Sequence, residues 1–585
     1  MSGRAGWILL VAGLALHAAL AVDTLRGASA TFDEGAHLPA GYTYLALGDH
    51  RLNPEQPPLV EVLAALPLLS LRPVVDRHHV SWTAARQWEF GRRFLYAWND
   101  GDRLLWRGRL GVVALSLALV AAVFLRTRSL AGPRAAAIAL LLAVLSPELL
   151  AHGTLVTTDL AVALFVFVAV TAFDRLATRA TPAAVVLLGL ATGAALASKF
   201  SGVVLGPVLL VLGGVVVLGE RPVESALWPG APRALTAPAA RGRHVALLLL
   251  LAAGVAVLTL WASYGFEPAL SPDPAVRARL RAPLDQPPSG LWQRGLVAAA
   301  NASLLPEDYV RGFVFVTEHS ESRRSFLLGR ISEEGFSWYF PVAFLLKTPL
   351  PLVLLVVLAL ARVPRLAPRT AAFLWIPVAL YLGLTASRGL QIGYRHLLPI
   401  LPFLFVAAAE AAARLLSWRR PLGALLVALL CGWYAVGTLR THPHHLAYFN
   451  EIAGGPANGW HALVDSNIDW GQDLKRLKVW MDEHAVTHVK LSYFGSADPA
   501  YYGIDCERLP GYAAPHPPRV TRQIRPGDVV AVSVTHLQGV YLDPGDRPMM
   551  ERLRRTTPIG RAGYSILIFR PDFAWPPPPG PGAVE

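Results

Sequence analysis

Long runs of apolar residues recur along most of the chain, separated by polar segments of varying length. A bilayer core requires about 20 predominantly apolar residues from a straight helix, and each run approaches that length. We expect membrane-spanning helices near residues 7–22, 104–125, 135–150, 157–173, 182–198, 201–218, 244–262, 338–361, 370–386, 396–416 and 421–438. The predicted fold class is therefore an all-α polytopic membrane protein with about eleven transmembrane helices.

The polar segments suggest how the rest of the chain is organised. Two of them, residues 23–102 and 262–337, are long and contain prolines and many charges. A third follows the last apolar run, and its composition predicts both strands and a helix. The strands are expected at residues 489–494, 529–534 and 564–569, and the helix at residues 473–484. We expect a membrane domain over 1–440, a small α/β domain over 441–575 and a disordered Pro-rich tail over 576–585.

Arginines in alternate short loops predict the orientation of the chain. Counted from a cytoplasmic N-terminus, every inside loop is basic, as the positive-inside rule requires. The residues concerned are Arg126, Arg128, Arg134, Arg175, Arg179, Arg221, Arg233, Arg241, Arg243, Arg362, Arg365, Arg369, Arg419 and Arg420. The long polar segments and the C-terminal domain then lie outside the cell's inner (plasma) membrane.

The first apolar run also permits a second interpretation. It follows Arg4 and precedes the small residues Gly27–Ala30, a layout that suits a cleaved signal peptide. We favour a retained first span because about ten similar segments follow it.

Composition agrees with a membrane protein and excludes other classes. Charged residues make up 16% of the chain, whereas soluble proteins have about 25%. The net charge of +13 comes mostly from loop arginines, without a basic stripe interleaved with aromatics, so we expect no nucleic-acid partner. Cys431 and Cys506 provide neither a disulfide framework nor a thiolate metal site.

An acid pair directly follows the first predicted span. Charges at membrane depth are costly and are usually retained for function. If Asp33 begins a helix, His37 shares its face while Glu34 points elsewhere. The pair suits a general base with its helper, two metal ligands, or a helix N-cap after Thr31.

Further polar residues lie at the predicted outer ends of other spans. In Asn53–Pro58 the prolines fix the backbone and hold Glu55 at the membrane surface, unless the segment is a simple re-entry turn. The others are Asp159, Lys199, Lys347, Arg395 and His396. Singly, each charge fits a snorkelling interfacial side chain. Together they place acids and cations on one side of the membrane, which a solvated face does not require.

Such a set suits the transfer of a sugar from a polyprenyl phosphate. Cations at the bilayer surface would bind the phosphate and stabilise the charge that grows as the glycosidic bond breaks. A carboxylate would take the proton of the acceptor hydroxyl.

Several segments resemble the protein O-mannosyltransferases and the bacterial lipid A aminoarabinose transferases (glycosyltransferase family 39 and relatives). The resemblance covers nearly the whole chain to about residue 480. It rests on Asp33-Glu34, Asn53–Pro58, Asp159, Tyr339–Pro341 through Lys347–Pro349, Tyr394–Pro399, His442–Glu451 and Asp465–Asp473.

The resemblance implies a GT-C fold and an inverting transfer without a covalent sugar–enzyme intermediate. It implies that Asp33 is the base and that Lys199, Lys347 and Arg395 hold the lipid phosphate. We expect catalytic residues at Asp33 and Glu34. The expected substrate-binding residues are His37, Asn53, Glu55, Asp159, Lys199, Lys347, Arg395 and His396. The chain shows no tandem MIR-type insert in its second long loop, so a protein acceptor is not implied.

The predicted function is an inverting glycosyltransferase that moves one sugar from a polyprenyl-phosphate donor to an extracytoplasmic protein, lipid or glycan. The sequence identifies no certain cofactor, and dependence on a divalent metal stays open because the acid pair permits a metal without requiring it. The alternatives are a transporter or lipid flippase, with ionisable residues near span midpoints, and an assembly protein that uses the C-terminal region for interaction.

Three other motifs in the C-terminal region are weak. Asp469–Gln472 only loosely resembles the W-W-D-x-G motif of oligosaccharyltransferases. His442, His444 and His445 suit zinc, but no cysteine accompanies them, and we favour a structural role. Residues 465–473 have the oxygen-rich outline of a calcium loop without its turn glycine and terminal Glu.

Overall fold

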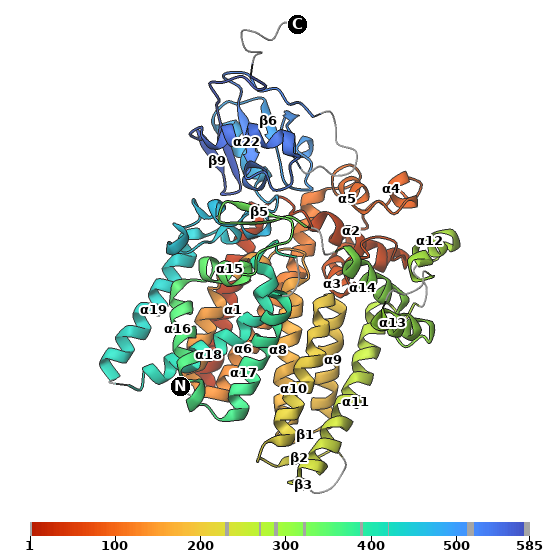
Figure 1. Cartoon of the computed structure of the whole chain (residues 1–585), viewed down its shortest axis with the longest axis vertical. Coiled ribbons are helices and arrows are strands. Elements are labelled where there is room, and N and C mark those ends of the chain that lie inside the picture. The colour runs from red at the N-terminus through yellow and green to blue at the C-terminus, as the bar shows by residue number, and fades with distance from the viewer. Residues whose placement is uncertain are drawn as a thin grey trace.

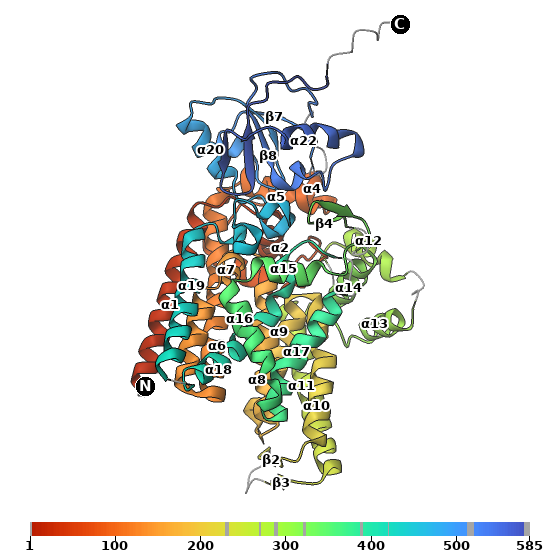
Figure 2. The same cartoon turned by 60° about the vertical axis from the view of Figure 1, so that its left-hand side comes forward.

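The computed structural model divides into a bundle of long helices and a compact sheet-containing domain at one end of it (Figure 1). It describes residues 3–577 except 228–232, 268–270, 286–289, 320–322, 387–389, 419 and 512–519. Most of the expected disordered tail, residues 578–585, lies outside the described residues. The N-terminus lies at the end of the bundle remote from the compact domain in both views (Figures 1 and 2).

Among the described residues, seven helical segments are long and apolar enough to cross a membrane. They are α1 (Gly3–Arg26), α6 (Gly101–Val144), η2 (Phe200–Val204) with α10 (Leu205–Leu218), α11 (Pro238–Ser263), α17 (Pro368–Ala386), η5 (Tyr394–Ile400) with α18 (Leu401–Leu415), and α19 (Arg420–Thr441). An eighth results if α15 (Tyr339–Lys347) and α16 (Leu350–Ala361), bent by 119°, count as one span. The predicted helical, polytopic architecture is confirmed.

The number of spans differs from the expected eleven for physical reasons. Helix α6 runs through two predicted spans and bends at Gly132, where a φ of 83° precedes Pro133. Helix α9 (Pro182–Ser198) has only 17 residues, short for a straight crossing. Helix α8 (Asp159–Leu176) carries charges at both ends.

The two long polar segments fold into short helices beside the ends of the bundle. The first contains α2 (Glu34–Leu47), α3 (Leu59–Ala65), η1 (Leu66–Ser70), α4 (Val80–Thr83) and α5 (Gln87–Tyr96). The second contains α12 (Pro274–Asp285), α13 (Leu291–Asn301), α14 (Glu307–His319), β4 (Ser325–Leu327) and β5 (Arg330–Ser332). A short helix, α7 (Pro147–His152), connects α6 to α8.

Glycines let α2 pack unusually close to its neighbours. A Cβ on Gly91 of α5 would lie 1.7 Å from the carbonyl oxygen of Gly35, and one on Gly41 would lie 2.1 Å from that of Glu61. Side chains at these positions would push the helices apart, so the glycines fix α2, which begins directly after Asp33.

A small sheet closes the end of the bundle remote from the compact domain (Figure 1). β1 (Arg179–Ala180) pairs in parallel with β2 (Val223–Ser225), which pairs antiparallel with β3 (Arg233–Leu235). The sheet joins the loop after α8 to the loop between α10 and α11.

The compact domain contains a mixed five-stranded sheet in the order β7-β6-β8-β10-β9. The strands are β6 (Val489–Ser492), β7 (Cys506–Arg508), β8 (Val530–Ser533), β9 (Gly560–Ala562) and β10 (Ile566–Phe569). The helices are α20 (Leu474–Glu483), α21 (Val534–Leu537) and α22 (Arg547–Arg554). β6, β8, β10 and α20 lie where sequence patterns predict strands and a helix. Both faces of the sheet are covered, since every residue of β6 and β8 is buried.

The compact domain is joined to the segment before Asp33 by backbone hydrogen bonds. Phe32 N–H donates to the Trp470 carbonyl at 2.8 Å, and Ser29 N–H donates to the Gln472 carbonyl at 3.0 Å. The Ser29 hydroxyl donates to the Gly471 carbonyl at 2.9 Å and accepts from Leu474 N–H at 3.0 Å. The domain thereby fixes the chain that leads into α2.

Candidate active site

Two acids and two cations from four elements meet beneath the compact domain. Arg395 Nη1 donates to Asp33 Oδ2 at 2.7 Å and lies 3.7 Å from Asp159 Oδ2. Lys199 Nζ donates to Asp159 Oδ1. Asp33 precedes α2, Asp159 begins α8, Lys199 follows α9 and Arg395 lies in η5. The structure thus brings together four of the predicted site residues.

Arg395 is held in place by the segment that enters the compact domain. Tyr394 N–H donates to Asn467 Oδ1 at 2.9 Å, and Ser466 Oγ donates to the Ile392 carbonyl at 2.7 Å. The Arg395 guanidinium lies over the Trp470 ring, 4.2 Å from its centroid. Rigid support of this kind keeps a charged group in one geometry.

The Asp33 carboxylate is ionised and partly accessible. Burial is the largest single influence and acts to raise its pKa, but Arg395, His37 and Arg323 together outweigh burial and hold the pKa of Asp33 below its ordinary value. Its side chain is 24% exposed, against 9% for Arg395 and 2% for Asp159. Of the three, Asp33 is therefore best placed to meet a molecule arriving from outside.

Glu34 points away from this cluster and is completely buried. Arg109 donates to both of its carboxylate oxygens, at 2.8 and 2.7 Å, and the backbone N–H groups of Thr31 and Val156 donate at 2.8 and 3.0 Å. Arg109 and these hydrogen bonds hold the pKa of Glu34 low, despite burial that would raise it. With every acceptor direction occupied, Glu34 ties the Asp33 segment to α6, and the geometry does not support the predicted catalytic role.

His37 interacts electrostatically with Asp33. Its imidazole also meets Asn53 at a carboxylate of α3, Glu61. His37 Nδ1 is 3.2 Å from Glu61 Oε1, and Asn53 Nδ2 donates to the same oxygen. Glu55 accepts from Gln87 Nε2 at 2.9 Å. Glu61 is a further buried acid at this point, recognisable in the sequence as a carboxylate inside an apolar run.

The Lys347 ammonium is buried and fully hydrogen-bonded, which does not suit a phosphate ligand. Its side chain is fully buried. The ammonium donates to the carbonyl oxygens of Leu446, Tyr448 and Asn467 at 3.0, 3.2 and 2.6 Å, and it lies 3.3 Å from Glu148. An ammonium has three protons, so none is left for a phosphate. These contacts tie Lys347 to the 446–467 segment, and the geometry gives no support to the expectation that Lys347 binds the donor.

His396 is next to Arg395 and remains available to a ligand. Its Nε2 is buried without a hydrogen-bond partner among the described residues. Phe340 packs against the imidazole, with a centroid separation of 6.2 Å. An unpaired buried nitrogen beside a cation cluster is suited to hydrogen bonding with substrate.

Arg323 and Asp465 complete the surroundings of the site, although no local sequence pattern places either of them beside Asp33. Arg323 is exposed and interacts electrostatically with both Asp33 and Asp465. Asp465 accepts from the Tyr541 hydroxyl, and burial raises the pKa of Asp465. Both come from segments remote in sequence, so only the fold shows that they face Asp33.

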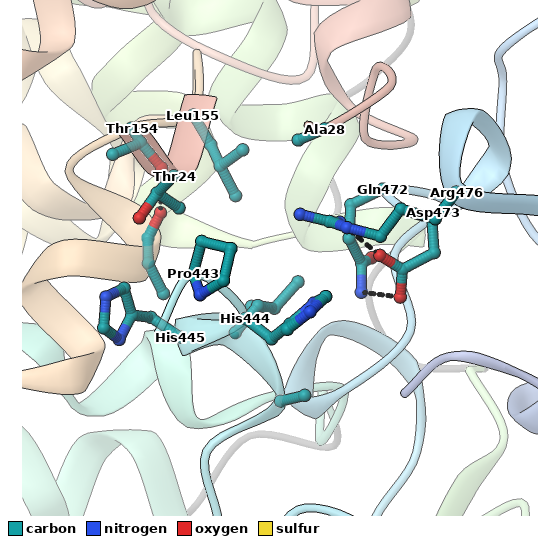
Figure 3. Close-up of a pocket in the computed structure, with 13 residues that line it drawn as sticks. Thr24, Ala28, Thr154, Leu155, Pro443, His444, His445, Gln472, Asp473 and Arg476 are labelled. Atoms are coloured by element: carbon teal, nitrogen blue, oxygen red, sulfur yellow. Dashed lines mark hydrogen bonds and ion pairs between the residues drawn. The ribbon is translucent and has the colours of Figure 1, made fainter. Parts of the chain in front are cut away.

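A cavity near the Asp33 cluster, beneath the compact domain, is too small for a sugar. It has a volume of about 30 Å³, room for little more than a water molecule or two. His444 and His445 lie on one side of it, and Asp473 with Arg476 lies on the other (Figure 3). Burial lowers the pKa of His445 to about 3, which agrees with a neutral, structural histidine.

The described residues contain no group of three or more His, Cys, Asp or Glu side chains arranged to hold a metal ion. The acids of the Asp33 cluster are instead paired with cations. The described side chains therefore supply no assembled metal site for the chemistry considered below.

One stretch of the chain is similar to a known sequence family. A sequence model described as dolichyl-phosphate-mannose-protein mannosyltransferase matches residues 101–228. The match confirms the predicted resemblance over this segment, which contains Asp159 and Lys199 but neither Asp33 nor Arg395. No curated protein sequence matches the chain.

Several solved structures are similar to the chain over most of its length. ArnT from Cupriavidus metallidurans in the apo state has 15% sequence identity and a TM-score of 0.48, covering 97% of this chain and 98% of that one. The same protein bound to undecaprenyl phosphate has 14% identity and a TM-score of 0.46, covering 96% and 98%. The archaeal oligosaccharyltransferase AglB from Archaeoglobus fulgidus, in complex with an inhibitory peptide and a dolichol-phosphate, has 12% identity and a TM-score of 0.47, covering 94% and 73%.

Proposed function

We propose that the chain is a GT-C glycosyltransferase that transfers one sugar from a polyprenyl phosphate to an acceptor on the outer face of the membrane. The observation that carries this proposal is the ion-pair cluster of Asp33, Arg395, Asp159 and Lys199. It combines an accessible ionised carboxylate with two cations at the ends of membrane helices. The family match over residues 101–228 supports the same class.

Asp33 is the proposed general base. It takes the proton of the acceptor hydroxyl while that oxygen forms a bond to the anomeric carbon. The bond from the anomeric carbon to the phosphate oxygen breaks at the same time, and its electron pair leaves with the polyprenyl phosphate. Attack opposite the leaving group inverts the anomeric centre, so no second carboxylate nucleophile is needed.

Arg395 and Lys199 are the proposed phosphate ligands. The donor phosphodiester carries one negative charge, and the leaving polyprenyl phosphate gains a second as the bond breaks. Cations fixed beside that oxygen stabilise the transition state more than the ground state. His396 and the exposed Arg323 are suitably placed to add further hydrogen bonds, whereas Lys347 is not.

The pairing of Arg395 with Asp33 suggests how donor binding prepares the base. A phosphate that draws the guanidinium away would remove the main interaction that keeps the pKa of Asp33 low. The carboxylate would then become a stronger base only when the donor is present. Asp33 would be least basic in the empty enzyme, when no sugar is available.

The proposed orientation places this cluster outside the inner membrane and the N-terminus in the cytoplasm. Asp159 and Arg175 lie at opposite ends of α8, roughly 24 Å apart at 1.5 Å per residue. The loop arginines therefore gather at the end of the bundle remote from Asp33. This distribution agrees with the positive-inside rule.

The experiment that tests the proposal is a transfer assay in membranes with radiolabelled polyprenyl-phosphate sugars. Wild type should transfer label to an acceptor, and Asp33→Asn should lower the rate by about 10³-fold or more, since a general base contributes about 10²–10⁴ and the site charge also changes. Asp76→Asn is the matched control, because Asp76 lies in the same outer segment and its Oδ1 only accepts from backbone N–H groups of His78 and His79. Equal transfer by wild type and Asp33→Asn would exclude Asp33 as the base, and absence of transfer from any donor would favour a transporter.

A further inference from the structure

A cavity of about 670 Å³ opens at the end of the bundle remote from Asp33. Its walls come from the middle of α6, the last turn of α8, the β1 and β2 segments, the start of α9 and the start of α17. Five arginines line it: Arg126, Arg175, Arg179, Arg221 and Arg369. The function proposed above does not use this cavity.

The charge of the lining is strongly unbalanced. Asp174 is the one carboxylate among the described lining residues. It pairs with Arg126 at 2.7 Å and with Arg369 at 2.8 Å, so one negative charge is shared by two guanidinium groups. Arg126 is buried, whereas Arg175, Arg179 and Arg221 are exposed, so the excess positive charge of the lining faces solvent.

Three of the arginines have no acidic partner within the described part of the chain. The side chains of Arg175, Arg179 and Arg221 form no ion pair within 4.0 Å there, although Glu224 is the strand partner of Arg179. Hydroxyl groups of Ser129, Thr178 and Thr181 also line the cavity. Guanidinium and hydroxyl donors around one hollow are the groups that bind phosphate oxygens.

Two structural features keep the cavity in shape. Arg369 donates to the Asp174 side chain and to the carbonyl oxygens of Asp174 and Ala177, which ties α17 to the end of α8. Pairing of β1 with β2 holds Arg179 and Arg221 on neighbouring segments. The arginines are therefore presented by packed elements rather than by one free loop.

We propose that this cavity binds an anionic phosphate group, independently of the sugar-transfer site. A phosphate group there comes either from the headgroup of an anionic phospholipid or from a soluble phosphate compound. The position at the ends of membrane helices, on the side that the arginine pattern assigns to the cytoplasm, favours the lipid, because basic pockets between helices at that surface bind anionic headgroups.

The test uses the purified full-length protein in a neutral detergent, with binding followed by native mass spectrometry and by Tm. Wild type should bind phosphatidylglycerol about tenfold or more tightly than phosphatidylcholine, and the double variant Arg179→Gln/Arg221→Gln should lose that preference. Arg365→Gln/Arg420→Gln removes the same charge from residues on the same side that do not line the cavity, and it should keep the preference. The charge-preserving Arg179→Lys/Arg221→Lys pair should retain most of it.

A parallel titration with inorganic phosphate distinguishes the two sources. A rise in Tm with phosphatidylglycerol but not with inorganic phosphate, lost only in the cavity variant, assigns the cavity to a lipid. A rise with inorganic phosphate that the cavity variant loses assigns it to a soluble compound. Equal losses in the cavity and control variants, or no preference for either anion in wild type, would overturn the proposal.

Discussion

At the scale of single residues, the adjacent acids Asp33 and Glu34 differ in exposure and in partners. Asp33 is partly exposed and faces Arg395, whereas Glu34 is buried against Arg109. The two lysines also differ. Lys199 belongs to the ion-pair cluster, whereas the ammonium group of Lys347 donates its hydrogen bonds to carbonyl oxygens. These contrasts allow a structural role and a chemical role to be told apart by paired substitutions.

The two lysines should respond differently to loss of charge. Lys347→Met leaves Glu148 and three carbonyl groups buried without their partner, which should cost about 3–5 kcal/mol of stability. Lys199→Met leaves Asp159 with Arg395 still 3.7 Å away, so it should lower the Tm less than Lys347→Met and mainly raise the KM for the donor. Tm measurements and donor titrations on both variants check this. The reverse pattern would restore Lys347 as the donor ligand.

Removing the Arg395 charge should move the acidic limb of the rate profile. The guanidinium lowers the pKa of Asp33, so Arg395→Gln should raise that pKa. Because the base must be ionised, activity in the variant should begin to fall at a higher pH than in wild type as the solution is made more acidic. The apparent pKa of kcat/KM on the acidic side should therefore shift upward, in addition to any uniform loss of rate. An unchanged limb would show that Arg395 does not act on the base.

At the scale of elements, close packing around α2 sets the position of Asp33. Gly41→Ala would place a methyl group 2.1 Å from the Glu61 carbonyl oxygen, forcing α2 and α3 apart. We expect a lower Tm and lower activity. Gly214→Ala is the control, since a Cβ at that position in α10 has nothing within 4 Å and alanine favours a helix. Equal behaviour of the two variants would mean that α2 and α3 adjust freely.

A buried acid in the sheet domain should make its stability depend on pH. Burial raises the pKa of Asp469 to about 8, so the group is protonated in the folded domain at neutral pH and ionised when unfolded. Its contribution is complete below about pH 4 and is lost as pH rises towards 8. Asp469→Asn should remove this part of the dependence and raise the Tm more at pH 8 than at pH 5. A constant Tm difference between the two proteins would contradict the assignment.

At the scale of the whole molecule, the compact domain and the N-terminal segment stabilise each other. Ser29→Ala removes two hydrogen bonds to residues 471 and 474, which should cost about 1–3 kcal/mol. Hydrogen exchange of residues 466–474 should accelerate, and transfer should slow although every charged residue remains. Unchanged exchange would indicate that the domain needs no support from this segment.

The sequence predicts the large features of the molecule well because they follow from local patterns. Apolar runs and strand composition locate the helices and β6, β8 and β10, and the charges at helix ends include Asp33, Asp159, Lys199 and Arg395. Other features depend on segments up to hundreds of residues away. They are the carbonyl oxygens that bind the Lys347 ammonium, the burial of Glu34 against Arg109 and the electrostatic interaction of Arg323 with Asp33. No local pattern records those contacts.

The distance in sequence between Asp33 and its partners has a consequence for biosynthesis. Asp33 leaves the ribosome well before Arg395, which follows 362 positions later, and the backbone groups that hold Phe32 and Ser29 come later still. During synthesis the first helices occupy the membrane with the carboxylate still without its arginine. The cluster is assembled only after residues 470–474 have been made, so a chain that stops before them would enter the membrane with Asp33 lacking this support.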